Sequence, residues 1–258
     1  GSQPKVMATT PPNPRLVRRP VMSDRPPGVT RGSTFENKAN LSQAFLHHIE
    51  MRYGDTRLGR QEIDGDILDE IEGALWTYSV FDLCRVHEPP SLERVVVAID
   101  PPVSHGEDAD ACGIVAAALG RDGHFYVLED ATIQGVSPEQ WARQAVSLFE
   151  KFDADRLVAE VNNGGDLVER VIRAISPHVP YRGVRASRGK MARAEPIAAL
   201  YEQNRVHHVG LMRELEDELC RYSGAKGEKS PDRMDALVWA LSDLVFSPQS
   251  APRMRAIL

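Results

Sequence analysis

Three acidic residues that lie far apart in the chain stand where an α/β protein collects its ligands. Asp100 directly follows the apolar run VVVAI, Glu160 lies inside AEVNNGGD near the end of a second predicted strand, and Asp235 lies in the first turn of the last predicted helix, inside PDRMDALVWA. Ligands of α/β sheets gather at the carboxyl ends of the strands. If the strands of Asp100 and Glu160 are parallel neighbours, both acids share one edge, and the last helix can bring Asp235 over them.

This cluster would suit metal-assisted hydrolysis. Three carboxylates in one place repel one another, so at least one stays protonated unless a cation neutralises them. Oxygen-only ligands suit Mg²⁺ or Mn²⁺ rather than zinc. Two such ions about 3.5–4 Å apart can hydrolyse a phosphodiester, because one activates water and the other stabilises the leaving oxygen. The acids would then hold metal rather than exchange protons with the substrate.

Each acid also has a purely structural explanation. Asp100 precedes two prolines and can simply end its strand, and Glu160 can pair at the rim of the sheet with a nearby arginine, Arg156 or Arg182. Asp235 and Asp232 both lie where acids cap the free N–H groups of a first helical turn and favour the helix dipole. Composition and spacing alone leave the functional and structural explanations open.

The elements that must position these acids follow a break at Pro89-Pro90. The run 94–100 predicts a strand buried on both faces, and a turn at 120–123 joins two further strands into a hairpin. Ser137, Pro138 and Gln140 predict a helix with a capping box. The order β-β-β-α-β-α-β-α predicts an α/β fold with a mixed sheet covered by helices. The strands are expected at 94–100, 112–119, 124–128, 156–161 and 181–186, and the helices at 137–152, 167–175, 192–204 and 231–246.

The chain before the break differs in character. Residues 3–34 are rich in Pro, Arg, Thr and Ser, which predicts an irregular or extended segment. Apolar residues at helical spacing predict a helix over 41–53, and a second helix is expected over 57–68. We therefore expect two domains, residues 1–88 and 89–258, the first being extended and helical.

Composition narrows the protein class. The 258 residues carry 31 Lys+Arg and 37 Asp+Glu, a formal net charge of −6, with 42% hydrophobic residues. These values exclude a collagen-like, disordered or coiled-coil chain. The acidic balance argues against coating nucleic acid by bulk charge, but not against a local basic patch. No apolar stretch approaches the ~20 residues of a membrane span. Three separated cysteines and the lack of a signal-peptide pattern favour a reducing, intracellular compartment.

Four strings resemble, in order, the C-terminal nuclease domain of the large terminase subunit, the DNA-packaging motor of tailed bacteriophages and of phage-derived gene transfer agents. They are VVVAIDPPVSHGEDADACGIVAAAL, AEVNNGGDLVERVI, SRGKMARAEPIAALYEQNRVHHVG and PDRMDALVWAL. KVMATTPPNP resembles the coupling motif late in the packaging ATPase, and residues 31–68 resemble the segment that joins ATPase to nuclease. Because no G-x-x-x-x-G-K-[ST] loop occurs, we expect residues 1–88 to be the tail of the ATPase region without its ATP-binding core.

The resemblance implies an RNase H-like sheet and an endonuclease dependent on Mg²⁺ or Mn²⁺, with two ions bound beside DNA. It implies cutting of concatemeric double-stranded DNA with little sequence specificity. Asp100, Glu160 and Asp235 match the family's acids, and Asp110 matches a further acidic position that could assist a metal or be a solvated loop acid. Asp232 is the rival for the third ligand.

The same resemblance implies partners and a location. These are the portal protein and the small terminase subunit, at the procapsid in the host cytoplasm, with no membrane contact and a monomeric isolated fragment.

Other groups support smaller hypotheses. Arg185, Arg188, Lys190 and Arg193 form a basic cluster at a strand-to-helix junction, which could hold DNA phosphates or be a solvated loop. Residues 162–165 could bind a phosphate through backbone N–H groups or form a plain turn. The loop 224–229 could contact DNA or gate the site. The histidine pairs at 47–48 and 207–208 have no third ligand at metal spacing and are interpreted as structural.

Two alternative functions stay open from sequence. Another RNase H-like nuclease, such as a junction resolvase, would share the acids but not the ATPase-like front. A docking module would bind the portal or the small subunit and show negligible nuclease activity in isolation.

Overall fold

The computed structural model describes residues 34–44, 46–47, 60, 68, 71–102, 110–162 and 165–247. The chain divides into two compact units, Gly1–Asp69 and Glu70–Leu258. In the first unit, a 3₁₀ helix, η1, spans Thr34–Asn40, and residues 43–44 and 46–47 are helical. Leu41 and Ser42 are described but are not helical. The other residues of the helix predicted over 41–53, the helix predicted over 57–68 except Arg60 and Leu68, and residues 3–33 lie outside the described residues.

The second unit begins before the predicted domain boundary. Residues 78–86 form helix α4 (Tyr78–Cys84) and strand β1 (Arg85–Val86), and β1 pairs with a strand near the end of the chain. The structural division at residues 69 and 70 therefore precedes the predicted boundary at 88 and 89, which stays a prediction about where one function ends and the next begins.

A seven-stranded mixed sheet in the order β1-β7-β4-β3-β2-β5-β6 forms the centre of the second unit. The strands other than β1 are β2 (Leu92–Asp100), β3 (Gly113–Gly120), β4 (Phe125–Asp130), β5 (Arg156–Glu160), β6 (Tyr181–Val184) and β7 (Val206–Val209). β3 runs antiparallel to both its neighbours, whereas the β2–β5, β5–β6, β4–β7 and β1–β7 pairs are parallel. The carboxyl ends of all strands but β3 therefore meet at one edge of the sheet.

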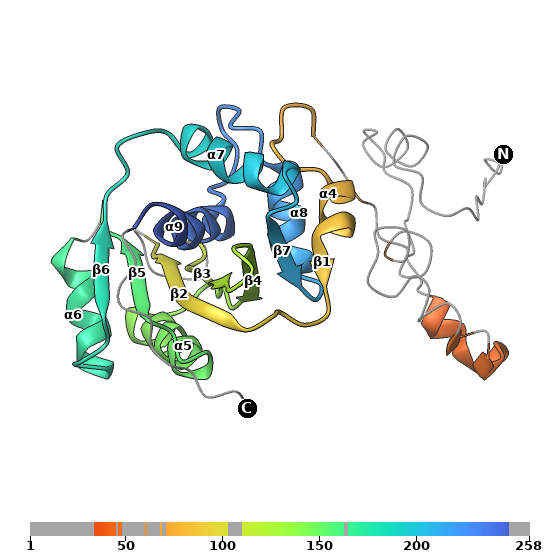
Figure 1. Ribbon diagram of the computed structural model, residues 1–258, viewed down its shortest axis with the longest axis horizontal. Coiled ribbons are helices and arrows are strands. Elements are labelled where there is room, and N and C mark those ends of the chain that lie inside the picture. Colours follow the sequence, from red (N-terminus) through yellow and green to blue (C-terminus); the bar gives the residue numbers. More distant parts are fainter. Residues whose placement is uncertain are drawn as a thin grey trace, which may run out of the picture. The chain divides into compact units, whose positions relative to one another are not determined.

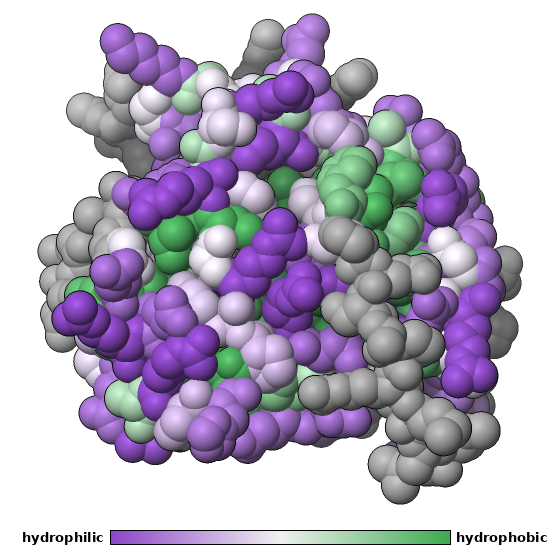
Figure 2. Space-filling model, turned by 60° about the vertical axis from the view of Figure 1, so that its left-hand side comes forward, coloured by the Kyte–Doolittle hydropathy of each residue, from purple (hydrophilic) through white to green (hydrophobic). Residues whose placement is uncertain are grey.

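Helices cover both faces of this sheet. α9 (Asp232–Phe246) packs on β2 and β3 from one face, and α5 (Pro138–Lys151) packs on the other face with α6 (Asp166–Ile175) beside it (Figure 1). α7 (Lys190–Glu202) contacts α9, and α8 (Arg213–Arg221) also packs against α9. The predicted mixed sheet flanked by helices is confirmed. With β6 and α6 turned forward, the surface is mainly hydrophilic, with apolar side chains in separate patches (Figure 2).

Alternation along the strands separates two cores. Val95, Val97 and Ile99 of β2 join the cluster that includes Trp141 of α5. Because successive side chains of a strand point to opposite faces, Asp100 falls on the α9 face. This face is closed by large, fully buried side chains of α9, namely Met234, Leu237 and Leu241.

The start of α5 follows its sequence signal. Ser137 accepts a hydrogen bond from the Gln140 backbone N–H, and the Gln140 side chain accepts one from the Ser137 backbone N–H, which together form the predicted capping box. Among the described helices, none has the length and apolar character required to cross a membrane.

Candidate active site

Asp100 and Glu160 lie on adjacent parallel strands, both at the carboxyl end. Ile99 pairs with Ala159 in the register of β2 and β5. The next residue on each strand is an acid, so Asp100 and Glu160 are neighbours across the two strands. Both side chains share the α9 face by strand alternation, since Leu157 and Ala159 belong to the opposite core. The condition that the sequence analysis set for a shared edge, that these two strands are parallel neighbours, is met.

α9 brings a third acid to this edge. Its first turn carries Asp235, whose side chain is 1% exposed. A close approach between α9 and β3 makes this possible: a Cβ added to Gly113 would lie 1.9 Å from the Asp232 carbonyl oxygen. Gly113 pairs with Asp100 in the β2–β3 register. A glycine at this position therefore allows the start of α9 to pack closely against the carboxyl end of β2 and the start of β3.

Two basic residues from the start of α7 lie among these acids. Arg193 places Nη2 2.9 Å from Asp235 Oδ1 and Nη1 3.2 Å from Glu160 Oε2. Lys190 pairs with the second oxygen of Asp235 and donates to Ser230 Oγ at 2.8 Å. Both were predicted as DNA contacts, and in this structure both are ion-pair partners of the acids.

Glu160 is held by two further side chains that the sequence analysis did not select. Trp239 Nε1 lies 2.5 Å from Glu160 Oε2, and Asn162 Nδ2 donates to Glu160 Oε1 at 2.6 Å. Asn162 also accepts a hydrogen bond from the Ala186 backbone N–H at 2.9 Å, which ties the end of β5 to the segment after β6. Trp239 is four residues after Asp235, and this helical spacing was the signal available in the sequence.

The electrostatics of the cluster are dominated by burial and by like charge. Burial, followed by the charges of Asp235 and Glu160, raises the pKa of Asp100 well above its ordinary value of 3.8. Burial also raises the pKa of Asp235, although Lys190 and Arg193 oppose that shift. Burial works against the charge of Lys190, but Asp235 and the other acids outweigh it and raise the Lys190 pKa overall.

The two rival acids have different surroundings. Asp232 is 5% exposed and accepts hydrogen bonds from the Ser230 side chain and the Ala111 backbone N–H. Burial and the nearby charge of Asp110 raise the pKa of Asp232. Asp110 itself is exposed. The bonds to Asp232 tie α9 to the segment that enters β3, whereas Asp110 stands at the rim.

The remaining basic residues and the loop lie around the same edge. Arg185 and Arg188 are exposed at the β6–α7 junction and make no ion pair with any described residue. The loop beginning at Ser223 is fixed by Glu228, which accepts hydrogen bonds from the Ser223 N–H and hydroxyl and from the Gly224 N–H. In the segment 162–165, residues 163 and 164 lie outside the described residues.

The histidines at 207 and 208 hydrogen-bond to protein groups. His207 Nδ1 lies 3.2 Å from the Cys84 carbonyl oxygen. His208 lies 2.8 Å from the Tyr201 hydroxyl and 3.0 Å from Glu216 Oε1. These contacts agree with the structural interpretation of this pair. Of the pair at 47–48, His48 lies outside the described residues.

The acid cluster fits a hard divalent cation by donor type and by charge. Asp100, Glu160 and Asp235 offer oxygen ligands only, which is the preference of Mg²⁺ and Mn²⁺. The Asp100 side chain makes no hydrogen bond or ion pair with any described residue, although the charge of Lys190 acts on it from nearby. Among the described side chains, no three of His, Cys, Asp or Glu converge closely enough to hold one ion. The positive charge that links Glu160 to Asp235 in this structure is the Arg193 guanidinium.

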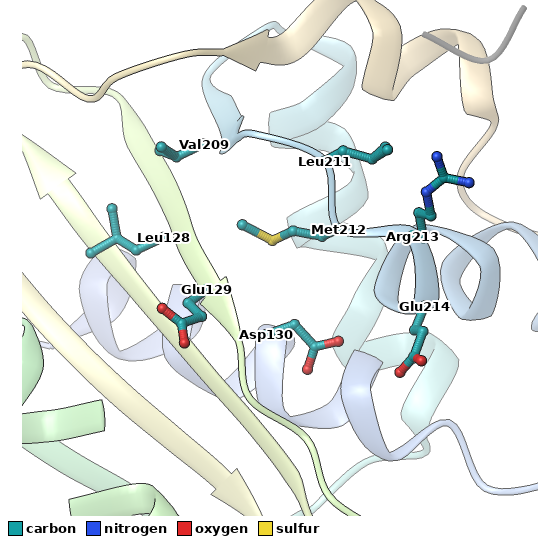
Figure 3. Close-up of a pocket in the computed structure, with 8 residues that line it drawn as sticks. All are labelled: Leu128, Glu129, Asp130, Val209, Leu211, Met212, Arg213 and Glu214. Atoms are coloured by element: carbon teal, nitrogen blue, oxygen red, sulfur yellow. The ribbon is translucent and has the colours of Figure 1, made fainter. Parts of the chain in front are cut away.

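A pocket of ≈470 Å³ lies along the same edge, between the ends of β4 and β7. Figure 3 shows Asp130 at the end of β4 facing Glu214 of α8 across it. Arg233 of α9 pairs with both acids, with 2.9 Å between Arg233 Nε and Asp130 Oδ2. None of the predicted site residues lines this pocket. It is therefore distinct from the acid cluster.

Comparisons with known proteins identify a matching family and solved structures with a similar fold. The terminase RNase H-like domain family matches residues 97–244, which is more than half of the chain. The nuclease domain of the large terminase subunit gp2 of bacterial virus Sf6 is 15% identical with a TM-score of 0.52, over 65% of this chain and 98% of that one. A mutant of that domain with manganese is 14% identical with a TM-score of 0.51, over the same shares of both chains.

A longer solved structure matches less of its own length. The HK97 bacteriophage large terminase is 14% identical with a TM-score of 0.50, over 78% of this chain and 50% of that one. No protein with a curated description matches the sequence. The structural likenesses show the fold, and the family match runs from the second half of β2 through most of α9. The chain therefore belongs to the family of terminase RNase H-like domains.

Proposed function

We propose that this domain is a divalent-metal-dependent endonuclease that hydrolyses phosphodiester bonds of double-stranded DNA within a genome-packaging terminase. One observation carries the proposal. Asp100, Glu160, Asp235 and Asp232 gather at the carboxyl edge of the sheet, where Lys190 and Arg193 are the basic groups, among the residues that the structure describes, that offset their charge. A surplus of buried negative charge is costly unless a cation joins it.

The proposed ligands are Asp100, Glu160 and Asp235. Trp239 and Asn162 orient the Glu160 carboxylate by holding one oxygen each. Bound Mg²⁺ or Mn²⁺ ions, two with DNA present, would supply an activated water and stabilise the leaving oxygen. Solved structures of a mutant Sf6 nuclease domain with manganese and with calcium support the use of divalent ions. Asp110 and Asp232 have weaker cases, because Asp110 is exposed and Asp232 is bound to Ser230 and Ala111.

The proposed DNA contacts are charged groups that recognise phosphate. Arg185 and Arg188 are exposed beside the acid cluster, and Lys190 and Arg193 reach it from the same junction. Such contacts position a duplex without reading its bases, which supports cleavage with little sequence specificity.

The biological setting is also part of the proposal. Family membership supports the cutting of concatemeric viral DNA in the host cytoplasm, with the portal protein and the small terminase subunit as partners. It also favours a terminase over a junction resolvase. The boundary between an ATPase-derived front and the nuclease at residues 88 and 89 belongs to this proposal as well.

Supercoiled plasmid cleavage with Mg²⁺, with Mn²⁺ and with EDTA tests the activity. Wild type, Asp100→Ala and the control Asp166→Asn, an exposed acid on α6, should be compared. We expect metal-dependent nicking in wild type and in the control, and a loss on the order of a hundredfold or more in Asp100→Ala. Equal cleavage by Asp100→Ala would contradict the site. No cleavage by wild type with either metal would favour a docking module.

A further inference from the structure

Arg193 occupies the centre of the acid cluster. Its side chain is 10% exposed, and its two terminal nitrogens contact a different acid each, Glu160 and Asp235. These contacts cross from α7 to both β5 and α9. A guanidinium can bridge two carboxylates in this way because its donors are arranged in a fixed, planar fork. Arg193 therefore already supplies positive charge to the oxygens proposed as metal ligands.

Trp239 contacts both members of this bridge. Its indole N–H lies 2.5 Å from Glu160 Oε2, which is also the oxygen that Arg193 contacts. The Arg193 guanidinium carbon lies 4.7 Å from the centre of the Trp239 ring, within the range of a cation–π interaction. The half-buried indole of Trp239 thus orients Glu160 through its N–H and holds the Arg193 guanidinium against its ring face.

We propose that Arg193 is a built-in counter-cation of the acid cluster, held on Trp239, and that its release to a DNA phosphate favours metal binding. The inference rests on the proposed nuclease function. Glu160 Oε2 and Asp235 Oδ1 bind a divalent ion less tightly while Arg193 contacts them, because the two positive charges repel each other. A DNA phosphate offers the guanidinium a replacement partner with bidentate geometry. Trp239 is then a positioning residue that keeps both Glu160 and Arg193 in place.

This arrangement makes the binding of DNA and of metal mutually dependent. If DNA tightens metal binding by withdrawing Arg193, metal must tighten DNA binding by the same factor. Without DNA, the charge of Arg193 weakens metal binding to the cluster. Cleavage is thereby favoured on duplex seated against the cluster.

Mn²⁺ binding tests the inference without relying on cleavage. It should be measured by calorimetry and electron paramagnetic resonance, with and without a short phosphorothioate duplex that resists hydrolysis. In wild type, DNA should tighten Mn²⁺ binding. Arg193→Gln should bind Mn²⁺ about tenfold more tightly without DNA, and DNA should then add little. The control Arg173→Gln, which breaks an exposed pair on α6, should behave as wild type.

Two further variants guard against loss of folding. Arg193→Lys retains the charge and should keep Mn²⁺ affinity near the wild-type value. Trp239→Phe retains a ring face but lacks the N–H, so it should keep the dependence on DNA while binding Mn²⁺ several-fold more weakly.

The outcomes separate this inference from the proposed function. If Arg193→Gln binds Mn²⁺ no more tightly than wild type, and DNA still tightens its binding, Arg193 is only a structural link and the inference is wrong. If no variant binds Mn²⁺ with or without DNA, the proposed metal site is wrong and the inference falls with it.

Discussion

The two ends of α9 each bury a carboxylate against the same face of the sheet, but they balance its charge differently. Near the C-terminal end, Asp243 is 5% exposed and meets one arginine from each of β2, β5 and β6. Arg94 pairs with one oxygen, and Arg182 Nη1 lies 2.7 Å from the other. Arg156 lies 3.3 Å from both. Every oxygen of this buried acid has a partner.

At the N-terminal end of α9, acidic side chains outnumber the basic side chains that contact them. Asp235 shares Arg193 with Glu160, while Asp100 has no direct partner among the described residues. Both oxygens of the Asp243 carboxylate have guanidinium partners, and removal of this acid would leave the buried Arg94 without a charge partner, which is strongly destabilising. A surplus of carboxylates stores repulsion that an added cation relieves. The comparison therefore assigns stability to one end of α9 and ligand binding to the other.

Removal of the Asp243 carboxylate, which has a guanidinium partner on each oxygen, should give the largest effect on stability. Asp243→Asn leaves Arg94, whose side chain is 7% exposed, without its charge partner. We expect a loss of about 3–5 kcal/mol in the free energy of unfolding, measured by urea denaturation. Metal-dependent cleavage by the folded fraction should persist. A loss below about 1 kcal/mol would show that the Asp243 cluster contributes no more than a surface ion pair.

A change at Gly113 should affect both stability and the acid cluster. In Gly113→Ala, the new methyl group would meet the Asp232 carbonyl at 1.9 Å and push the start of α9 from the strands. We expect a loss of about 1–3 kcal/mol in unfolding free energy, together with reduced cleavage and Mn²⁺ affinity. Gly189→Ala is the matched control, because its Cβ would meet nothing within 4 Å. An unaltered Mn²⁺ affinity in Gly113→Ala would show that the close approach does not position Asp235.

The surplus of acids predicts a stability gain on removing one of them. Burial and the neighbouring acids raise the pKa of Asp100, so its folded pKa exceeds its unfolded pKa of 3.8. Its contribution to stability is then fully present below pH 3.8 and is lost as the pH rises. In EDTA, Asp100→Asn should therefore be more stable than wild type at neutral pH, and the difference should shrink as the pH falls towards 3.8. Thermal unfolding across pH measures this, and a destabilised Asp100→Asn at neutral pH would contradict it.

The exposed arginines should give the smallest effect. A plot of log affinity for DNA against log salt concentration has a negative slope, to which each phosphate contact adds about 0.9 in magnitude. The double variant Arg185→Gln, Arg188→Gln should make this slope shallower by about 2. Fluorescence anisotropy with duplexes of unrelated sequence measures this slope. The double variant Arg170→Gln, Arg173→Gln on α6 is the control. Equal slopes in the two double variants would remove Arg185 and Arg188 from the DNA surface.

Much of the second unit could be predicted from its sequence. β2 is a long apolar run, β3 and β4 flank a strong turn signal, and α5 begins at a capping box. The sequence analysis missed β7, a four-residue strand whose centre is two histidines, and α8, whose sequence RELEDELCR is mostly charged. Neither has an apolar pattern strong enough to stand out, and both depend on packing against distant elements.

The site was predicted in part. The three acids were selected because each follows or begins a strong element, and the structure brings them to one edge. Lys190 and Arg193 were predicted to face DNA, but in this structure they pair with the acids, which only the packing of α7 on α9 reveals. Trp239 was not selected, because its spacing from Asp235 indicates a shared helix face but not the contact with Glu160, which lies on a different element.

The most direct test of the charge surplus is stabilisation by metal. A cation that binds only the folded state should raise the unfolding free energy of wild type by about 2.7 kcal/mol at a hundredfold excess over its dissociation constant. We predict this gain with Mn²⁺ for wild type and for Asp243→Asn, and its loss in Asp100→Asn. An equal gain in Asp100→Asn, or no gain in wild type, would contradict the assignment of ligand binding to the N-terminal end of α9.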